Sequence, residues 1–231
     1  MRVVILAAGM GSRLDDSPHH LPKALTLLHN QASILDCQLR VLASYLSLDQ
    51  VLVVVGYEKE AIMSAFPDLV YVFNPDFQKE NTSKSLLRAL KKVDEDVLWL
   101  NGDVVFRPEI LKPLLQANRT GMVVNRAVVG QEEVKYCMDN QGCITEVSKE
   151  IAQPQGEALG INFFKRDDML WLRCNLEQCQ TNDFFEKGIE MGLIQGQKVW
   201  SFPVEIDDCV EIDFPEDLTR AKQLVRSWGL A

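Results

Sequence analysis

The sequence lacks long apolar runs, paired cysteines and any surplus of basic residues. No run approaches the roughly 20 apolar residues that a membrane-spanning helix needs. The six cysteines are scattered, with no C-x-x-C pair and no histidine at metal-ligand spacing, so we expect small apolar or incidental surface residues at these positions. These absences predict a cytoplasmic protein that binds no membrane.

The charge balance is acidic, with 24 Lys and Arg against 33 Asp and Glu and a formal net charge of -9. This balance argues against nucleic acid as the main partner, because phosphate backbones are bound by basic surfaces. It is compatible with a nucleotide ligand, because a few placed cations, backbone amides and a metal ion hold a triphosphate inside an acidic protein.

The length and the uniform composition predict one domain over residues 1–231. A chain of 231 residues, of which 47% are hydrophobic, is long enough for one sizeable core and short for two complete domains. No internal repeat, low-complexity stretch or linker marks a boundary. The pattern does not separate a monomer from a homodimer.

The first half of the chain alternates apolar runs with helical patterns. Continuous apolar runs at 3–8, 51–55, 70–73 and 97–100 are typical of strands that are buried on both faces. Apolar residues at helical spacing lie between them, at 34–46 and 86–93. This alternation predicts βαβ units on a largely parallel sheet.

The second half is richer in strand-like runs. Runs at 122–126, 134–138, 144–147 and 158–164 predict further strands, and Asn140-Gln-Gly142 predicts a hairpin turn between two of them. Helical patterns return at 167–173, 183–191 and 215–228. We therefore expect an α/β fold, a single-domain Rossmann-like three-layer α/β/α sandwich with a mixed, mostly parallel sheet and a β-hairpin inserted over its carboxyl edge.

A glycine-rich loop follows the first predicted strand, where an open α/β sheet has its ligand crevice. Gly9 and Gly11 would let backbone amides approach phosphate oxygens, and Arg13 and Lys23 add two cations. A dinucleotide fingerprint would need glycine in place of Leu14, and a Walker A loop would need Gly-Lys-Ser/Thr, which does not occur. A plain strand-to-turn glycine pair with surface cations is the alternative.

Two aspartates follow other predicted strands. Asp103 comes after the fourth run, and Asp213 lies between a short strand and the last predicted helix. Mg²⁺ prefers one or two carboxylates together with phosphate oxygens and waters, so two aspartates that face one crevice suit it. The alternatives are a turn residue for Asp103 and a helix N-cap for Asp213. Glu211 is expected to be structural or to support the metal ligands, and the pair Asp207-Asp208 to lie in a solvated loop.

The full string Leu6-Ala-Ala-Gly-Met-Gly-Ser-Arg-Leu14, with Leu21-Pro-Lys-Ala-Leu25 behind it, resembles the signature of the sugar-phosphate and alcohol-phosphate nucleotidyltransferase family. With Gly102-Asp103 and the Glu211-Ile-Asp-Phe-Pro-Glu-Asp-Leu218 segment, the resemblance covers nearly the whole chain and is nearest to phosphocholine cytidylyltransferase-like proteins. It implies a fold of the nucleotide-diphospho-sugar transferase type. It also implies catalytic cations at Arg13 and Lys23, Mg²⁺ ligands at Asp103 and Asp213, and nucleotide contacts at Leu6, Ala7, Ala8, Gly9, Gly11 and Ser12.

The same resemblance points to two further nucleotide-binding residues, Asn81 and Ser85, and to residues of the acceptor side. Asn81 and Ser85 lie in a segment that enters a helix near the nucleotide in such proteins, although capping of that helix explains them equally well. Lys149 matches a lysine that binds the acceptor phosphate in relatives, and Glu157 lies in a matching Gly-Glu-x-x-Gly strand. Asp183 is a further acceptor candidate, and like Lys135 it competes with a solvated surface position.

The resemblance implies Mg²⁺-dependent transfer of CMP from CTP to a small phosphorylated alcohol such as phosphocholine, with release of pyrophosphate. Residues 1–105 would bind the nucleotide, and residues 106–231 would bind the acceptor and supply the second metal ligand. Cys209 stands where many relatives carry an aromatic residue suited to a quaternary ammonium group. Tyr136, Phe163, Trp200 and Phe202 are candidates for building a choline cage in another way.

Several functional alternatives stay open at this point. The acceptor could be an aminoalkylphosphonate or a sugar-1-phosphate, the latter with a uridylyl or guanylyl donor. A metal-dependent glycosyltransferase is disfavoured because the chain has Asp103-Val-Val where such enzymes carry D-x-D. A nucleotide-binding regulatory relative without turnover is disfavoured because Arg13, Lys23, Asp103 and Asp213 are all present.

Overall fold

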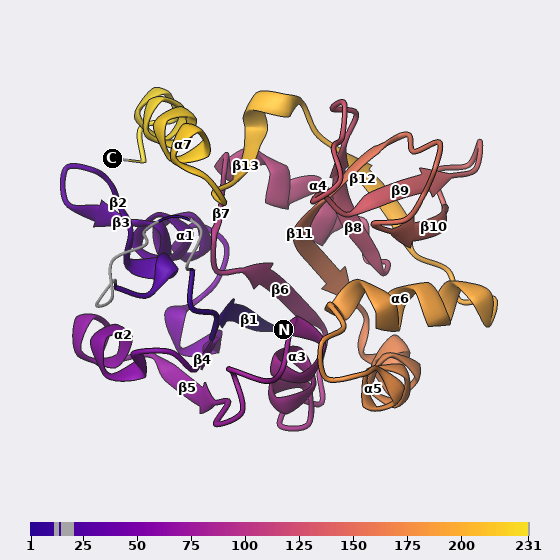
Figure 1. Cartoon of the computed structure of the whole chain (residues 1–231), viewed down its shortest axis with the longest axis horizontal. Helices are drawn as coiled ribbons and strands as arrows, with labels where there is room; N and C mark the ends of the chain where they lie inside the picture. Colours follow the sequence, from indigo (N-terminus) through magenta and orange to yellow (C-terminus); the bar gives the residue numbers. More distant parts are fainter. Residues whose placement is uncertain (12–13, 15–20, 231) are drawn as a thin grey trace.

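The computed structural model describes residues 1–11, 14 and 21–230, which form a central mixed sheet between two layers of helices (Figure 1). Nine strands of the described chain form this sheet, in the order β10-β9-β11-β6-β1-β4-β5, with β8 beside β11 and β12 beside β8. The strands are β1 (Arg2–Ala7), β4 (Val51–Val55), β5 (Val70–Phe73), β6 (Val97–Asn101), β8 (Gly121–Asn125), β9 (Lys135–Met138), β10 (Ile144–Ser148), β11 (Gly156–Phe164) and β12 (Trp200–Pro203). All of them except β10 and β11 run in one direction, so the sheet is mostly parallel as expected.

Helices cover both faces of the sheet and give the predicted three layers. The helices are α1 (Ile34–Ala43), α2 (Lys59–Ala65), α3 (Thr82–Leu90), α4 (Leu111–Gln116), α5 (Met169–Gln178), α6 (Phe185–Ile194) and α7 (Pro215–Ser227). One core lies between the sheet and α3, α5 and α6, and the other between the sheet and α1, α2 and α4. Among the described residues, no helix is long and apolar enough to cross a bilayer.

The central strands are buried on both faces because their side chains alternate between the two cores. In β1, Val4 and Leu6 enter one core and Val3 and Ile5 the other. The run at 70–73 differs from the prediction, because β5 is the edge strand of the sheet. Two of its four residues, Val70 and Phe73, are exposed, and only Val72 is buried.

A small two-stranded sheet ties the end of the chain to its middle. Here β7 (Val104–Phe106) pairs antiparallel with β13 (Cys209–Glu211), and the next residue, Ile212, donates its backbone N–H to the carbonyl of Asp103 at 3.0 Å. The helix α7 packs against β7, β13 and the ribbon formed by β2 (Leu27–His29) and β3 (Ala32–Ser33) (Figure 1). Segments from both ends of the described chain therefore meet beside the carboxyl end of β6.

The predicted hairpin is present, and it extends the sheet past the end of β6. The strands β9 and β10 pair through a turn in which Gly142 has a φ of 84° and the Asp139 carboxylate accepts backbone N–H groups. The hairpin joins β11 through Gly156 and Glu157, which precede the part of β11 that pairs with β6. Because β11 runs opposite to β6, its beginning projects beyond the carboxyl edge and forms a wall of the cleft there.

Candidate active site

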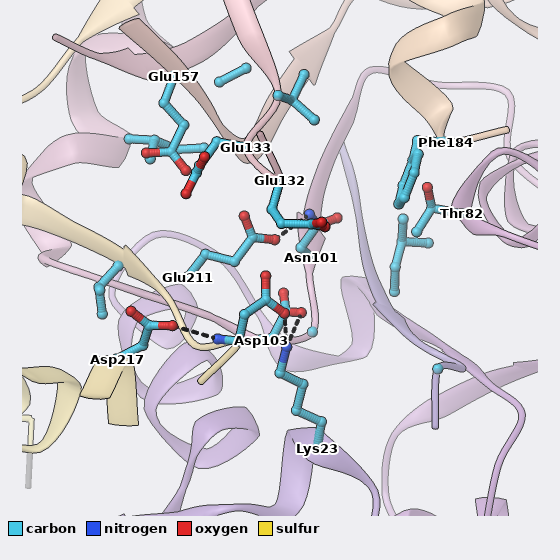
Figure 2. A pocket seen from close by; sticks show the side chains of 18 of the residues that line it. Lys23, Thr82, Asn101, Asp103, Glu132, Glu133, Glu157, Phe184, Glu211 and Asp217 are labelled. Atoms are coloured by element: carbon cyan, nitrogen blue, oxygen red, sulfur yellow. Dashed lines mark hydrogen bonds and ion pairs between the residues drawn. The ribbon is translucent and has the colours of Figure 1, made fainter. Parts of the chain in front are cut away.

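A cleft of about 640 Å³ opens at the carboxyl ends of β1 and β6. Its walls come from the glycine-rich loop, the β6–β7 connection, the start of α3, the segment 127–134, the start of β11, the start of α6 and the segment between β13 and α7. In Figure 2, Lys23 extends toward Asp103, Glu133 and Glu157 lie together on another wall, and Thr82 and Phe184 lie on a third. The walls enclose the place where the sequence predicts a ligand.

Lys23 lies between the two aspartates that were predicted to bind a metal. Its Nζ is 2.8 Å from Asp103 Oδ2 and 2.6 Å from Asp213 Oδ1, and its side chain is 14% exposed. Burial lowers the pKa of Lys23, but the two carboxylates outweigh burial and raise that pKa above its ordinary value. Lys23, Asp103 and Asp213 thus form one charged cluster, although they lie 80 and 190 residues apart along the chain.

Asp103 reaches the cluster because the chain turns tightly after β6. The N–H of Gly102 donates to the carbonyl of Leu6 at 2.9 Å, and a Cβ on Gly102 would lie 2.5 Å from that same oxygen. Only glycine allows this approach between the end of β6 and the end of β1. The alternative for Asp103, a simple turn residue, accounts for its position but not for its contact with Lys23.

Asp213 is held by Asp217, in the first turn of α7. Asp217 Oδ2 accepts the backbone N–H of Asp213 at 3.0 Å and that of Phe214 at 2.8 Å, as Figure 2 shows for this region. The N-cap of α7 is Phe214, so the N-cap alternative for Asp213 is wrong. The side chain of Asp213 is free to point toward Lys23 because Asp217 supplies the bonds that the helix start needs.

The carboxylates around Lys23 fit a hard divalent cation. No group of three or more His, Cys, Asp or Glu side chains in the described part of the chain is arranged as a complete metal site, but Mg²⁺ needs only one or two carboxylates beside phosphate oxygens. Asp103 Oδ1 is buried and has no hydrogen-bond partner among the described residues. Burial, followed by the charges of Asp103 and Asp213, raises the pKa of Glu211 well above its ordinary value.

Most of the described part of the glycine-rich loop lines the cleft. Leu6, Ala7, Gly9 and Gly11 lie on its wall, whereas the Ala8 carbonyl accepts the backbone N–H of Tyr57 at 3.1 Å. Predicted residues Ser12 and Arg13 lie outside the described residues.

Asn81 and Ser85 have different surroundings. Asn81 is the N-cap of α3, with its side chain accepting the Thr82 N–H, and it also lines the cleft. Ser85 is 5% exposed inside α3, and its hydroxyl accepts a bond from Asn74 Nδ2 at 3.1 Å. The structure therefore places Ser85 behind the wall of the cleft, in contact with another protein side chain.

Two of the three predicted acceptor residues lie on the cleft wall. Lys149 Nζ lies 4.5 Å from the centre of the Phe184 ring and 3.8 Å from Glu132. Glu157 accepts a bond from Asn125 Nδ2 at 3.1 Å, and burial raises the pKa of Glu157. Asp183 is not on the wall, because its carboxylate accepts the Gln180 backbone N–H at 2.7 Å in the turn before α6.

Several cleft residues were not predicted from the sequence. They are Glu132, Glu133, Phe184, Glu186, Asp217 and Arg220. Glu132 and Glu133 lie in a segment without regular structure, so no periodic pattern marks them. Asp217 belongs to the Pro-Glu-Asp run that predicted the start of the last helix, and its spacing from Asp213 was the available signal.

The aromatic residues proposed for a choline cage do not line the cleft. Tyr136, Phe163, Trp200 and Phe202 are absent from its wall, which instead carries Phe77, Phe184, Phe185 and Phe214. Cys209 is on the wall and 2% exposed. The prediction that these four residues form a choline cage is therefore wrong for this cleft.

Comparison with known proteins identifies the family. The model of the MobA-like NTP transferase domain matches residues 3–159. A UTP–glucose-1-phosphate uridylyltransferase of Haloferax volcanii is 25% identical over 236 residues, covering 96% of this chain and 96% of the relative. A CMP-5'-(3-aminopropyl)phosphonate synthase of Streptomyces rubellomurinus is 37% identical over 129 residues, covering 53% of this chain and 20% of the relative. The chain thus spans about a fifth of the Streptomyces relative.

Solved structures share the whole fold. The inositol-1-phosphate CTP transferase of T. maritima matches with a TM-score of 0.80 at 18% identity, covering 98% of this chain and 95% of that one. The CTP:phosphocholine cytidylyltransferase of Streptococcus pneumoniae matches with a TM-score of 0.76 at 17% identity, covering 97% and 98%. The chain belongs to the MobA-like NTP transferase domain family.

Proposed function

We propose that the enzyme transfers CMP from CTP to a small phosphorylated alcohol and releases pyrophosphate, with Mg²⁺ as cofactor. The observation that carries this proposal is the convergence of Lys23, Asp103 and Asp213 beside the glycine-rich loop. CTP is favoured as donor because both described fold neighbours are named as CTP-using enzymes and the Streptomyces relative is named for a CMP product.

The residues of the cleft divide the chemical tasks between them. Asp103 and Asp213 would hold Mg²⁺, which when bound supplies positive charge next to the triphosphate. Lys23 and Arg13 would neutralise the negative charge that builds up on the phosphate oxygens and on departing pyrophosphate. Backbone amides of the loop at Gly9 and Gly11 would position the phosphates.

The acceptor needs orientation more than deprotonation. A phosphate monoester is already an anion near neutral pH, so its oxygen attacks the α-phosphorus of CTP without a general base. Lys149 would bind the acceptor phosphate, and catalysis then rests on positioning and charge neutralisation. In this proposal residues 1–105 hold the nucleotide, and residues 106–231 hold the acceptor and supply Asp213.

An acceptor with an amino group is the second candidate. Burial raises the pKa of Glu157, and the charge of Glu133, which lies on the same wall in Figure 2, raises it further. A positively charged substituent on the acceptor would relieve this repulsion, and the Streptomyces relative is named for an aminopropylphosphonate product. A sugar-1-phosphate acceptor with UTP is supported by the name of the Haloferax relative alone.

Pyrophosphate release tests the proposal directly. CTP, UTP and GTP would each be combined with phosphocholine, 3-aminopropylphosphonate and glucose 1-phosphate in the presence of Mg²⁺. We expect turnover with CTP and an alcohol-linked acceptor, and loss of turnover in Asp103→Asn but not in Asp139→Asn, which changes an aspartate of the hairpin turn. Turnover only with UTP and glucose 1-phosphate would overturn the assignment of donor and acceptor.

A further inference from the structure

The ammonium group of Lys23 and a divalent cation require the same carboxylate oxygens. Asp103 and Asp213 each direct one oxygen at Lys23 Nζ, at 2.8 and 2.6 Å. If both aspartates bind a metal ion, that ion would lie beside the position that the ammonium holds. Two cations at such a distance repel strongly in a site where the lysine is only 14% exposed.

We propose that Lys23 is an exchangeable counter-ion: it holds Asp103 and Asp213 together in the free enzyme and leaves them only when a nucleoside triphosphate offers its phosphates in their place. The inference rests on the metal role of the two aspartates in the proposed function. It means that the metal ion enters with the nucleotide, and that the free enzyme binds free metal poorly.

The surroundings of Lys23 restrict this exchange to its side chain. The backbone is held in a 3₁₀ turn over Lys23–Leu25, with the Thr26 N–H donating to the Lys23 carbonyl at 2.9 Å. Gly11 packs against the Cβ of Lys23. The outer part of a lysine side chain is flexible and carries a compact charge, so the ammonium can change partners while its backbone stays in place.

The charges near Asp103 explain why the free enzyme needs a cation there. Asp103 and Asp213 lie close to Glu211 and interact with it electrostatically, and Asp103 Oδ1 has no hydrogen-bond partner in the part of the chain that the structure describes. Without Lys23 the carboxylates would face one another uncompensated, a costly arrangement in a partly buried site. A lysine in this position keeps the aspartates in place for the metal while it blocks the metal from entering alone.

Binding of free Mn²⁺ in the absence of nucleotide tests the exchange without any turnover. The depletion of the electron paramagnetic resonance signal of aqueous Mn²⁺ would be measured for the wild type and for Lys23→Met, which removes the charge and keeps most of the side-chain volume. Because occupancy by Lys23 reduces the fraction of enzyme competent to bind metal, we expect Lys23→Met to bind Mn²⁺ about tenfold or more tightly than the wild type. The double variant Lys23→Met/Asp103→Asn is expected to lose this gain.

Lys165→Met is the matched control. Lys165 is also held at two short contacts, to Asp96 and Asn118, both at 2.6 Å, but it does not line the cleft. Its removal is expected to leave Mn²⁺ affinity unchanged. Equal Mn²⁺ affinity of the wild type and Lys23→Met, or an equal gain in both lysine variants, would overturn the proposal.

The Mn²⁺ affinity of the wild type and the turnover of CTP distinguish the remaining outcomes. If Lys23→Met does not fold without metal, the wild type alone decides, because tight binding of free Mn²⁺ by the wild type at Asp103 contradicts the exchange. The Mn²⁺ result is independent of which nucleotide or acceptor is used, so failure of CTP turnover would leave it standing. Conversely, turnover with CTP together with an unchanged Mn²⁺ affinity in Lys23→Met would support the proposed function and reject the exchange.

Discussion

Gly11 lies directly against the side chain of Lys23. A Cβ added to Gly11 would come within 2.8 Å of Lys23 Cβ, and the φ of Gly11 is +67°. The glycine thus serves the site in two ways: it permits the left-handed turn of the loop and it leaves room for the lysine that contacts both aspartates.

Gly11→Ala is therefore expected to lower kcat/KM strongly and to lower the free energy of unfolding only slightly. Displacement of Lys23 should reduce kcat/KM by roughly tenfold or more, because small shifts of charged groups in such sites are costly. The left-handed backbone costs about 1 kcal/mol of folding free energy. Steady-state kinetics and thermal unfolding would measure the two effects.

Gly196→Ala provides the matched control for this substitution. Gly196 has a φ of +85° and nothing within 4 Å of its added Cβ. It should show a similar loss of stability with unchanged kcat/KM. Equal kcat/KM values for the two variants would show that the contact between Gly11 and Lys23 does not affect catalysis.

Asp217→Ala should weaken metal use through Asp213. The substitution removes the acceptor for two backbone N–H groups that fix Asp213 and Phe214, so we expect a higher Mg²⁺ concentration for half-maximal rate and a stability loss of about 1 kcal/mol. Asp217→Asn keeps an acceptor oxygen and should recover most of the activity. The Mg²⁺ dependence of the initial rate measures the effect.

The hairpin turn offers the corresponding control for Asp217. Asp139 Oδ1 also accepts two backbone N–H groups, from Gln141 and Cys143, away from the active-site cleft. Asp139→Ala should lose stability without a change in Mg²⁺ dependence. If both alanine variants keep the wild-type Mg²⁺ dependence, Asp217 does not position Asp213 for the metal.

Ser85→Ala separates a structural role from nucleotide binding. Because the Ser85 hydroxyl accepts a bond from buried Asn74, its loss leaves an unpaired amide and should cost about 1–2 kcal/mol of stability. The KM for the nucleotide should not change. Asn81→Ala, at the cleft wall, should raise that KM, and a raised KM in Ser85→Ala would restore the predicted nucleotide contact.

Glu186 should make the protein less stable as the pH rises. Burial at 7% exposure raises the pKa of Glu186 to about 7, opposed in part by a backbone hydrogen bond and by Lys149. Below pH of about 4.5 the carboxyl is protonated in both folded and unfolded chains, whereas between about 4.5 and 7 only the unfolded chain ionises, which favours unfolding. Above pH 7 the accumulated loss stays constant.

Glu186→Gln should therefore be more stable than the wild type at pH 8, by up to about 3 kcal/mol, with the difference shrinking as the pH falls toward 5. Urea unfolding at several pH values measures it. The exposed residue Glu150 supplies the control, since Glu150→Gln should show no such pH-dependent difference. A constant difference between wild type and Glu186→Gln across this pH range would contradict the assignment.

The sequence pattern located the central strands closely because they are buried on both faces. The run at 51–55 coincides with β4, where every residue is buried, and the run at 97–100 ends one residue before β6 ends. The run at 70–73 is equally apolar, yet β5 lies at the sheet edge. Composition cannot distinguish these cases, because the number of neighbouring strands is a property of the assembled sheet.

The site was predictable where residues follow strand ends and unpredictable where they lie in irregular segments. Asp103 follows β6, so its place at the carboxyl edge came from the pattern alone. Its meeting with Asp213 depended on the pairing of β7 and β13, for which only the family resemblance gave a signal. Glu132 and Glu133 belong to a segment without periodicity, and the inward orientation of Ser85 depends on its partner Asn74.

During synthesis on the ribosome, β7 cannot pair until β13 has been synthesised, about a hundred residues later. Until that strand and the first turn of α7 have emerged, Asp213 has no fixed position and Lys23 has only Asp103 as a partner. Loop closure over such a separation makes this contact a late one in folding. The nascent chain would therefore acquire this charged cluster only after Asp213 has been synthesised, and premature termination before Asp213 would leave the larger sheet without the cluster.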